Sequence, residues 1–210
     1  SVPADVTPQL RGFRPGEGFS DPVASGDITM PAVGFVSIRA IDSDDQPLPV
    51  RVQTAPVGRA EPSIEAKYGE PDRPGRRTHV VFPLDGEVTL PLLPGMHQVV
   101  VSRGYEYDIF DSDITVTAGP PPAAPMTVVL DRVVDTTGVM CADYHIHTDR
   151  SPDSEDPALW KLGTAAADGL EIPCRSDHEW VYEWDVLGQE NGLGDYVYGV
   201  TSMELTTFAW

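Results

Sequence analysis

Acidic and imidazole side chains alternate along one short stretch of the chain. Asp143, His145 and His147 stand at every second position in the segment A-D-Y-H-I-H-T. The apolar lead-in over residues 138–142 predicts a strand, in which alternate side chains line one face at a rise of ~3.3 Å per residue. Two imidazoles ~7 Å apart along such a backbone can converge on one metal ion with bonds of ~2.0–2.1 Å. The alternative is a strand end that carries surface histidines.

The elements around this stretch predict a β-α-β unit. A strand over 138–144 leads into the histidine loop, and residues 158–168 have the apolar spacing of a helix. A second strand over 170–175 follows and ends in Ser176-Asp177-His178. Parallel strands joined through a helix end at the same edge of their sheet, which is where α/β active sites are built.

Several potential metal ligands should therefore meet at one sheet edge. His145 follows the first strand and His178 the second, and Asp153 and Asp177 belong to the same two connections. Neutral imidazoles with carboxylates are the donor set that Zn, Mn and Fe prefer. The sequence thus predicts a divalent metal site.

The preceding residues have the pattern of a β-sandwich. Short alternating strands separated by Pro- and Gly-rich turns are typical of antiparallel sandwiches. We expect three regions: an extended N-terminal arm over 1–31, a β-sandwich over 32–134 and the metal-site unit over 135–210. A long loop is expected over 57–76. The predicted strands lie around 36–40, 50–52, 78–82, 87–90, 97–102, 113–117 and 127–130.

Three segments of the sandwich region resemble the carboxypeptidase regulatory-like, transthyretin-type domain. They are G-F-V-S-I-R-A-I-D-S-D-D-Q-P-L-P-V-R-V, L-P-L-L-P-G-M-H-Q-V-V-V-S-R-G-Y and T-V-V-L. The resemblance implies an accessory domain without catalytic residues.

The region after residue 138 resembles the PHP (polymerase and histidinol phosphatase) metallohydrolases, in their carbaryl-hydrolase-like branch. The motifs that carry the resemblance are D-Y-H-I-H-T, S-P-D-S, A-A-A-D-G-L-E and S-D-H, in that order. The resemblance implies a distorted (βα)₇ barrel that holds two or three metal ions, expected to be Zn, Mn or Fe. It implies that His145 and His147 bind one ion and that Asp153 and His178 bind another.

Further roles follow from the same resemblance. Glu204, in G-V-T-S-M-E-L-T-T after an expected strand over 196–201, matches a bridging carboxylate, and catalytic roles fall to Asp177 and Glu204. Asp143 and Asp177 would orient ligand imidazoles. Three aromatic side chains that follow His178 could wall a substrate pocket or pack against the barrel rim: Trp180, Tyr182 and Trp184.

The implied function is hydrolysis of phosphoesters or of small esters and carbamates by a metal-bound hydroxide, with a small molecule as substrate. The resemblance covers only residues 138–210, whereas such barrels need ~200–250 residues. We therefore expect missing ligands beyond Trp210, or a barrel completed in another way. Two alternatives stay open: a non-catalytic binding or surface protein with an incomplete site, and a purely structural metal site.

Composition restricts the partners. The net charge of −19 argues against nucleic acid and acidic membranes, which attract Lys and Arg. No run reaches the ~20 apolar residues that span a bilayer. No targeting signal is recognisable, and export to the periplasm or cell exterior is favoured over the cytoplasm.

Cys141 and Cys174 are expected as buried free thiols, with a disulfide as the alternative for an exported chain. The oligomeric state is left open.

Overall fold

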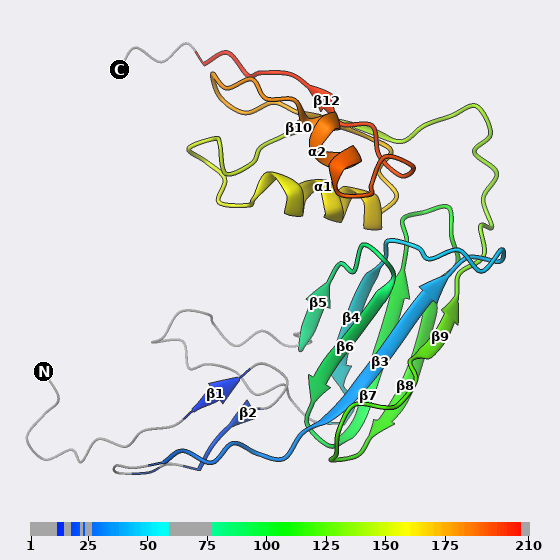
Figure 1. The fold of residues 1–210 in the computed structure, drawn as a ribbon, viewed down its shortest axis with the longest axis vertical. Helices are drawn as coiled ribbons and strands as arrows, with labels where there is room; N and C mark the ends of the chain where they lie inside the picture. The colour runs from blue at the N-terminus through cyan, green and yellow to red at the C-terminus, as the bar shows by residue number, and fades with distance from the viewer. Residues whose placement is uncertain (1–11, 15–17, 22, 24–26, 59–76, 207–210) are drawn as a thin grey trace, which may run out of the picture.

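The computed structural model describes residues 12–14, 18–21, 23, 27–58 and 77–206. Within them, a sandwich of two sheets lies beside a smaller α/β unit (Figure 1). One sheet of the sandwich has the strand order β6-β3-β9, and the other has the order β5-β4-β7-β8. The strands are β3 (Gly34–Ile41), β4 (Arg51–Pro56), β5 (His79–Val81), β6 (Glu87–Leu92), β7 (Gly95–Ser102), β8 (Phe110–Val116) and β9 (Met126–Val129).

Alternation of apolar and polar residues forms this sandwich. Along β7, every second residue from His97 to Val101 is buried, and β4 buries Val52 and Thr54 in the same way. Each buried Val or Leu side chain contributes ~1.5–3 kcal/mol through removal of apolar surface from water. The shared core contains Val36, Ile38, Ala40, Leu48, Val50, Val52, Leu90, Leu92, Val99, Val101, Val116, Val128 and Leu130. The β-sandwich prediction is confirmed.

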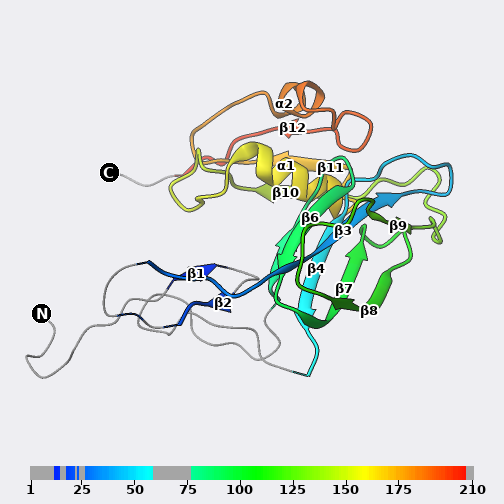
Figure 2. The same ribbon diagram turned by 60° about the horizontal axis from the view of Figure 1, so that its bottom comes forward.

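The strand pairing differs from the prediction in one respect. β3 pairs with β6 in antiparallel orientation but with β9 in parallel orientation, so the sheet β6-β3-β9 is mixed. The predicted loop over 57–76 falls, except for Val57 and Gly58, outside the described residues. Much of the predicted arm over 1–31 does so too. Its described part includes a short hairpin of β1 (Phe13–Arg14) and β2 (Gly18–Phe19), which lies to one side of the sandwich (Figure 2).

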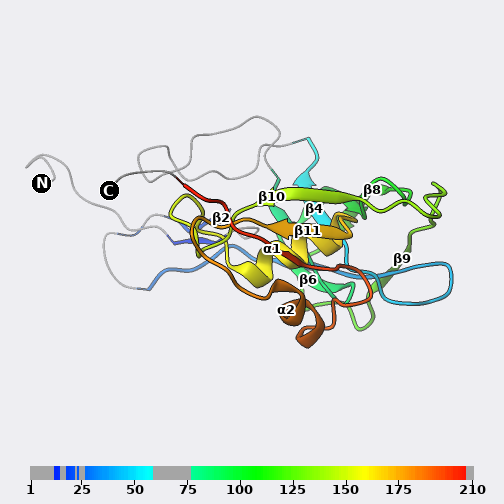
Figure 3. The same ribbon diagram turned by 90° about the horizontal axis from the view of Figure 1, so that it is seen from above.

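The second unit is built on a parallel sheet of the order β10-β11-β12 (Figure 3). Its strands are β10 (Ala142–Ile146), β11 (Ile172–Arg175) and β12 (Val200–Thr201), and its helices are α1 (Ala158–Ala167) and α2 (Trp184–Glu190). The predicted β-α-β unit is therefore present, whereas α2 was not predicted. Helix α1 lies between this sheet and the sandwich (Figures 1 and 3). The core of the unit contains Leu162, Ala165, Ala166, Trp184, Leu193 and Val197.

The expected (βα)₇ barrel is not formed by the described residues. A barrel requires each strand to pair on both sides. Here β11 pairs with two neighbours, while β10 and β12 are the edges of an open sheet of three strands. The sandwich part of the fold prediction is therefore confirmed, whereas the described residues give no evidence of a (βα)₇ barrel.

The two units are joined by polar contacts at a close backbone approach. The Arg103 guanidinium, buried at the end of β7, donates through Nη1 to Pro49 O at 2.7 Å and to Ala166 O at 2.6 Å. Ala166 O, which also accepts the Gly169 N–H at 3.3 Å, is one of the last carbonyls of α1, and a cation is favoured at that end of a helix. The Tyr196 hydroxyl donates to Pro47 O at 2.9 Å. These bonds set the position of α1, and with it the parallel sheet, against the sandwich.

Candidate metal centre

Strand β10 carries two imidazoles to one edge of the parallel sheet. His145 lies within β10 and His147 follows its last residue, so their side chains emerge on the same side. Their rings stack, with centroids 4.9 Å apart and planes 15° from parallel. The His145 side chain is 66% exposed and that of His147 only 13%, so the pair reaches from the protein interior to solvent.

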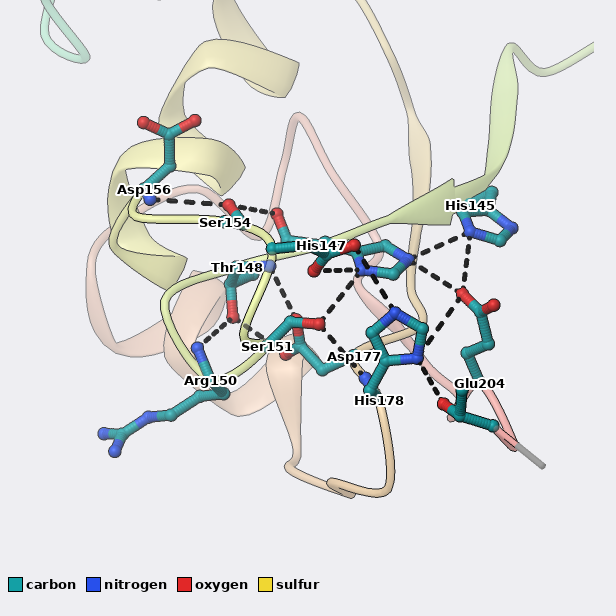
Figure 4. Close-up of polar contacts among 12 residues, drawn as sticks. His145, His147, Thr148, Arg150, Ser151, Ser154, Asp156, Asp177, His178 and Glu204 are labelled. Atoms are coloured by element: carbon teal, nitrogen blue, oxygen red, sulfur yellow. Dashed lines mark hydrogen bonds and ion pairs between the residues drawn. The ribbon is translucent and has the colours of Figure 1, made fainter. Parts of the chain in front are cut away.

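The ends of the other two strands bring the remaining members. His178 follows β11 and forms a parallel bridge with Glu204, which follows β12. The backbone N–H of Glu204 donates to Asp177 O at 3.1 Å, and that of Glu179 donates to Glu204 O at 3.1 Å. These bonds extend the sheet past its regular strands. They hold Glu204 against the two β10 imidazoles (Figure 4).

The first donor group consists of His145, His147 and Glu204. The Nε2 atoms of the two histidines are 2.9 Å apart. The Glu204 Oε2 atom is 3.0 Å from His145 Nε2 and 3.1 Å from His147 Nε2. Three atoms that can each offer a lone pair thus form a nearly equilateral triangle.

The second donor group consists of His147, Asp153 and His178. Asp153 Oδ1 is 2.9 Å from His147 Nδ1, and Asp153 Oδ2 is 3.4 Å from His178 Nε2. The Nδ1 atom of His178 is 2.5 Å from the Thr206 hydroxyl. His147 belongs to both groups, with a different ring nitrogen in each.

Hydrogen bonds keep Asp153 ionised. The Ser151 hydroxyl, and after it the His147 ring, hold the pKa of Asp153 far below its ordinary value. Ser151 is buried, at 4% exposed, and its oxygen lies 3.0 Å from His147 Nδ1 and accepts the backbone N–H of His178 at 3.3 Å. The loop between β10 and α1 therefore presents a fixed carboxylate to the histidine pair.

Two other predicted residues lie close to the cluster without facing an imidazole. Asp177 is fully buried, accepts the Thr148 backbone N–H at 2.6 Å and the Thr148 hydroxyl at 2.8 Å, and pairs with Arg175 at 3.3 Å. Asp143 accepts the backbone N–H of His145 at 3.0 Å. Both carboxylates therefore hold the backbone that carries the histidines, rather than their rings.

The three aromatic side chains expected at a pocket separate in the structure. Trp184 is fully buried in the core of the second unit and donates through its ring N–H to Ala158 O. Tyr182 stacks on the Arg175 guanidinium at 5.1 Å, and Trp180 is half exposed. Trp184 thus serves packing, while the other two lie on the loop between β11 and α2.

Three residues of the centre were missed in the sequence. Thr148, Ser151 and Thr206 each touch a side chain of the centre through a hydroxyl. Ser151 had a usable signal, since a turn residue four positions after a histidine can return to its ring. Thr206 had none, because its contact with His178 spans 28 residues.

The triangle of His145, His147 and Glu204 has dimensions suited to a cation. Adjacent ligand atoms of an octahedral shell with bonds of ~2.1 Å are about 3.0 Å apart. The observed edges are 2.9, 3.0 and 3.1 Å. Two imidazole nitrogens and one carboxylate oxygen are donors that Zn, Mn and Fe accept, and the octahedral spacing fits Mn and Fe(II), whereas tetrahedral Zn sites have edges of about 3.4 Å.

Two further expectations concern the burial of the cysteines and the presence of a membrane-spanning segment. Both cysteines are free, Cys174 is buried and Cys141 is exposed, so the expectation of two buried thiols holds for Cys174 alone. Among the described residues, no helix is both long and apolar enough to cross a bilayer.

No protein-family model matches the chain, and no curated protein matches it. Several solved structures are similar to parts of it, and two of them are described here. The major pilin subunit BcpA of Bacillus cereus is 13% identical over 54% of this chain and 33% of its own, with a TM-score of 0.35. The Bacillus anthracis TIE protein is 12% identical over 66% of this chain and 22% of its own, with a TM-score of 0.34. The chain therefore spans a third or less of each.

These comparisons overturn the family assignment. No family model and no curated protein matches the chain, so nothing beyond the short motifs supports the PHP resemblance. The prediction of a phosphoester or carbamate hydrolase is wrong with it. The catalytic roles of Asp177 and Glu204 came from the same resemblance and stay predictions. The motifs that suggested the family are short. A parallel sheet that gathers polar residues at one edge can carry His-x-His and Asp-His motifs without the PHP fold.

Proposed function

We propose that this protein is a non-catalytic binding protein whose second unit holds a divalent cation between His145, His147 and Glu204. The observation that supports this proposal is the close triangle formed by His145 Nε2, His147 Nε2 and Glu204 Oε2, with edges of 2.9–3.1 Å. One carboxylate and two imidazoles at such separations favour a positive charge between them. Zn, Mn and Fe(II) are the candidate ions.

The proposed ion would act as a structural link. His145 and His147 belong to β10 and the residues just after it, while Glu204 follows β12, and these are the two edge strands of the parallel sheet. Strand β12 has only two residues, so few backbone bonds hold it to β11. An ion shared by both edges would stabilise the segment around Glu204, because binding to the folded state alone adds to its stability.

Thermal unfolding with and without metal tests this proposal. At an ion concentration 100-fold above the dissociation constant, binding adds ~2.7 kcal/mol, which corresponds to about 5–10 °C in Tm for a chain of this size. We expect that increase with at least one of Zn²⁺, Mn²⁺ and anaerobic Fe²⁺. It should be absent in His145→Ala and in Glu204→Gln.

Two matched variants serve as controls. His79→Ala removes a histidine of the sandwich whose Nε2 bonds to Pro91 O, and Glu87→Gln removes an exposed carboxylate paired with Arg39. Both should keep the full metal-induced increase, whatever their own Tm. The proposal fails if no ion raises the Tm of the unaltered chain, or if Glu204→Gln responds as the unaltered chain does.

We also propose that the protein works outside the cytoplasm, as its sequence favours. Fractionation of cells that produce it would place it in the periplasmic, surface or culture fraction, and recovery with the cytoplasmic markers would contradict export. A small-molecule partner, and the lack of nucleic-acid and membrane partners, stay predictions.

A further inference from the structure

His147 links the two donor groups of the metal centre, and each group uses a different nitrogen of its ring. Its Nε2 faces His145 and Glu204, whereas its Nδ1 faces Asp153 and Ser151 (Figure 4). A neutral imidazole carries one N–H and one lone pair, so only one of its nitrogens can bind an ion. Whichever nitrogen carries the proton decides which group is the site.

The contacts on the Nδ1 side require a proton there. The Asp153 carboxylate is ionised and can only accept, so a lone pair on Nδ1 at 2.9 Å from Oδ1 would face another lone pair. The Ser151 oxygen, 3.0 Å from Nδ1, accepts the His178 N–H and can accept from Nδ1 as well, so it is compatible with a proton on that nitrogen. The Nδ1 proton therefore goes to Asp153.

The contacts on the Nε2 side then call for a cation. With the proton on Nδ1, His147 Nε2 carries a lone pair that points at Glu204 Oε2, 3.1 Å away. His145 Nε2 lies 2.9 Å from His147 Nε2 and 3.0 Å from Glu204 Oε2, and it carries at most one N–H to donate to these two atoms. A metal ion satisfies all three atoms together.

We infer that Asp153 is a positioning residue that holds the Nδ1 proton of His147, so that the two overlapping donor groups form a single cation site at His145, His147 and Glu204. This inference rests on the proposed function and narrows it. It replaces the two-ion arrangement expected from the sequence, in which Asp153 was itself a ligand. A carboxylate behind a ligand histidine sets its tautomer and raises its basicity.

Histidine ring NMR on the metal-free, ¹⁵N-labelled chain at pH 7.5 tests the proton position without any metal. We expect His147 as the Nδ1–H tautomer, and Asp153→Asn should shift the population toward Nε2–H. The control Asp149→Asn changes an exposed carboxylate of the same loop that pairs with Arg150 instead, and should leave the tautomer unchanged. An Nε2–H tautomer, or a ring protonated on both nitrogens, in the unaltered chain would overturn the inference.

Metal titration tests the number of sites and the role of Asp153. Calorimetry with Zn²⁺ should give one ion per chain, and Asp153→Asn should weaken binding by about 10–100-fold while keeping that stoichiometry. The visible absorption of bound Co²⁺ should be the same in Asp153→Asn at saturation and altered in His147→Ala, because only His147 is a ligand. Two ions per chain, or an altered Co²⁺ spectrum in Asp153→Asn, would refute the positioning role. If no ion binds, the proposed function and the single cation site both fail, and the tautomer measurement still decides whether Asp153 holds the Nδ1 proton of His147.

Discussion

Single carboxylates around the centre differ in how far they are buried, and burial decides how much the loss of each would lower the free energy of unfolding. Asp153 is half exposed and its hydrogen bonds involve side chains of its own loop, whereas Asp177 is fully buried beside an equally buried Arg175. The Asp177 carboxylate also accepts the Thr148 N–H directly after His147. A buried charge pair contributes little net free energy when intact, but removal of one partner leaves the other charge unpaired.

Asp177→Ala should therefore lower the free energy of unfolding by ~3–5 kcal/mol, because Arg175 loses its buried counter-charge. Urea denaturation followed by circular dichroism measures the change. Replacement of both partners, as Arg175→Met with Asp177→Leu, should recover part of the loss. Asp149→Ala, on the exposed loop, should stay within ~0.5 kcal/mol of the unaltered chain. A loss below ~1 kcal/mol for Asp177→Ala would show that the pair is not buried as described.

At the scale of elements, two glycines allow the turn after β7 to approach the turn after α1. Gly104 has φ +55° and Gly169 has φ +72°, both in the left-handed region that L side chains rarely adopt. A Cβ on Gly104 would lie 2.5 Å from Asp168 O. The close approach places Arg103 within reach of the C-terminal carbonyls of α1.

Gly104→Ala is expected to cost ~2–4 kcal/mol, from left-handed strain of ~1–2 kcal/mol and from the clash with Asp168. Gly192→Ala separates these two effects, because Gly192 has φ +74° and a Cβ added there would meet no atom within 4 Å. It should cost only the strain of ~1–2 kcal/mol. Equal losses for the two variants, measured by urea denaturation, would mean that the turns do not touch.

At the scale of the whole molecule, an ion pair between the sandwich and the second unit is only partly shielded from water, since the Arg51 side chain is 39% exposed and that of Asp168 is 46% exposed. Asp168, after α1, has its pKa raised because burial penalises its charged form, and Arg51 of β4, 4.0 Å away, opposes this shift. A carboxyl whose pKa is higher in the folded than in the unfolded state binds more protons when folded. Its contribution to stability therefore grows as the pH falls from neutral through the folded pKa toward the unfolded value near ~3.9.

Asp168→Asn should remove this contribution. Between pH 7 and about pH 4, the free energy of unfolding of the variant, relative to the unaltered chain, should decline as the pH falls, since only the unaltered chain gains stability from Asp168 protonation. Urea denaturation across that range measures the difference. Asp113→Asn, on the exposed side of β8, controls for the loss of one negative charge. A difference that is constant with pH, or that rises on acidification, would contradict the raised pKa.

The sequence by itself determined the local structure of both units. The alternation of apolar and polar residues predicted the sandwich strands, and the spacing of Leu162 and Ala166 predicted α1, because these signals are properties of neighbouring residues. It also determined which side chains come to the edge of the parallel sheet, since strands joined through a helix end on the same side. His145, His147 and His178 do meet there, with Glu204 among them.

Only the tertiary structure decided how the sheet ends and what each polar group touches. Closure of a barrel depends on which strands pair. In the described part of the chain, β10 and β12 each pair only with β11, and local periodicity does not reveal which strands lie at the edges of a sheet. The roles of Asp153, Asp177 and Trp184 depend on contacts with Ser151, Arg175 and the helix core, which no motif records. The short metal-like motifs predicted that the ligands would meet, but a family resemblance carried by so few residues could not say which reaction, if any, they serve.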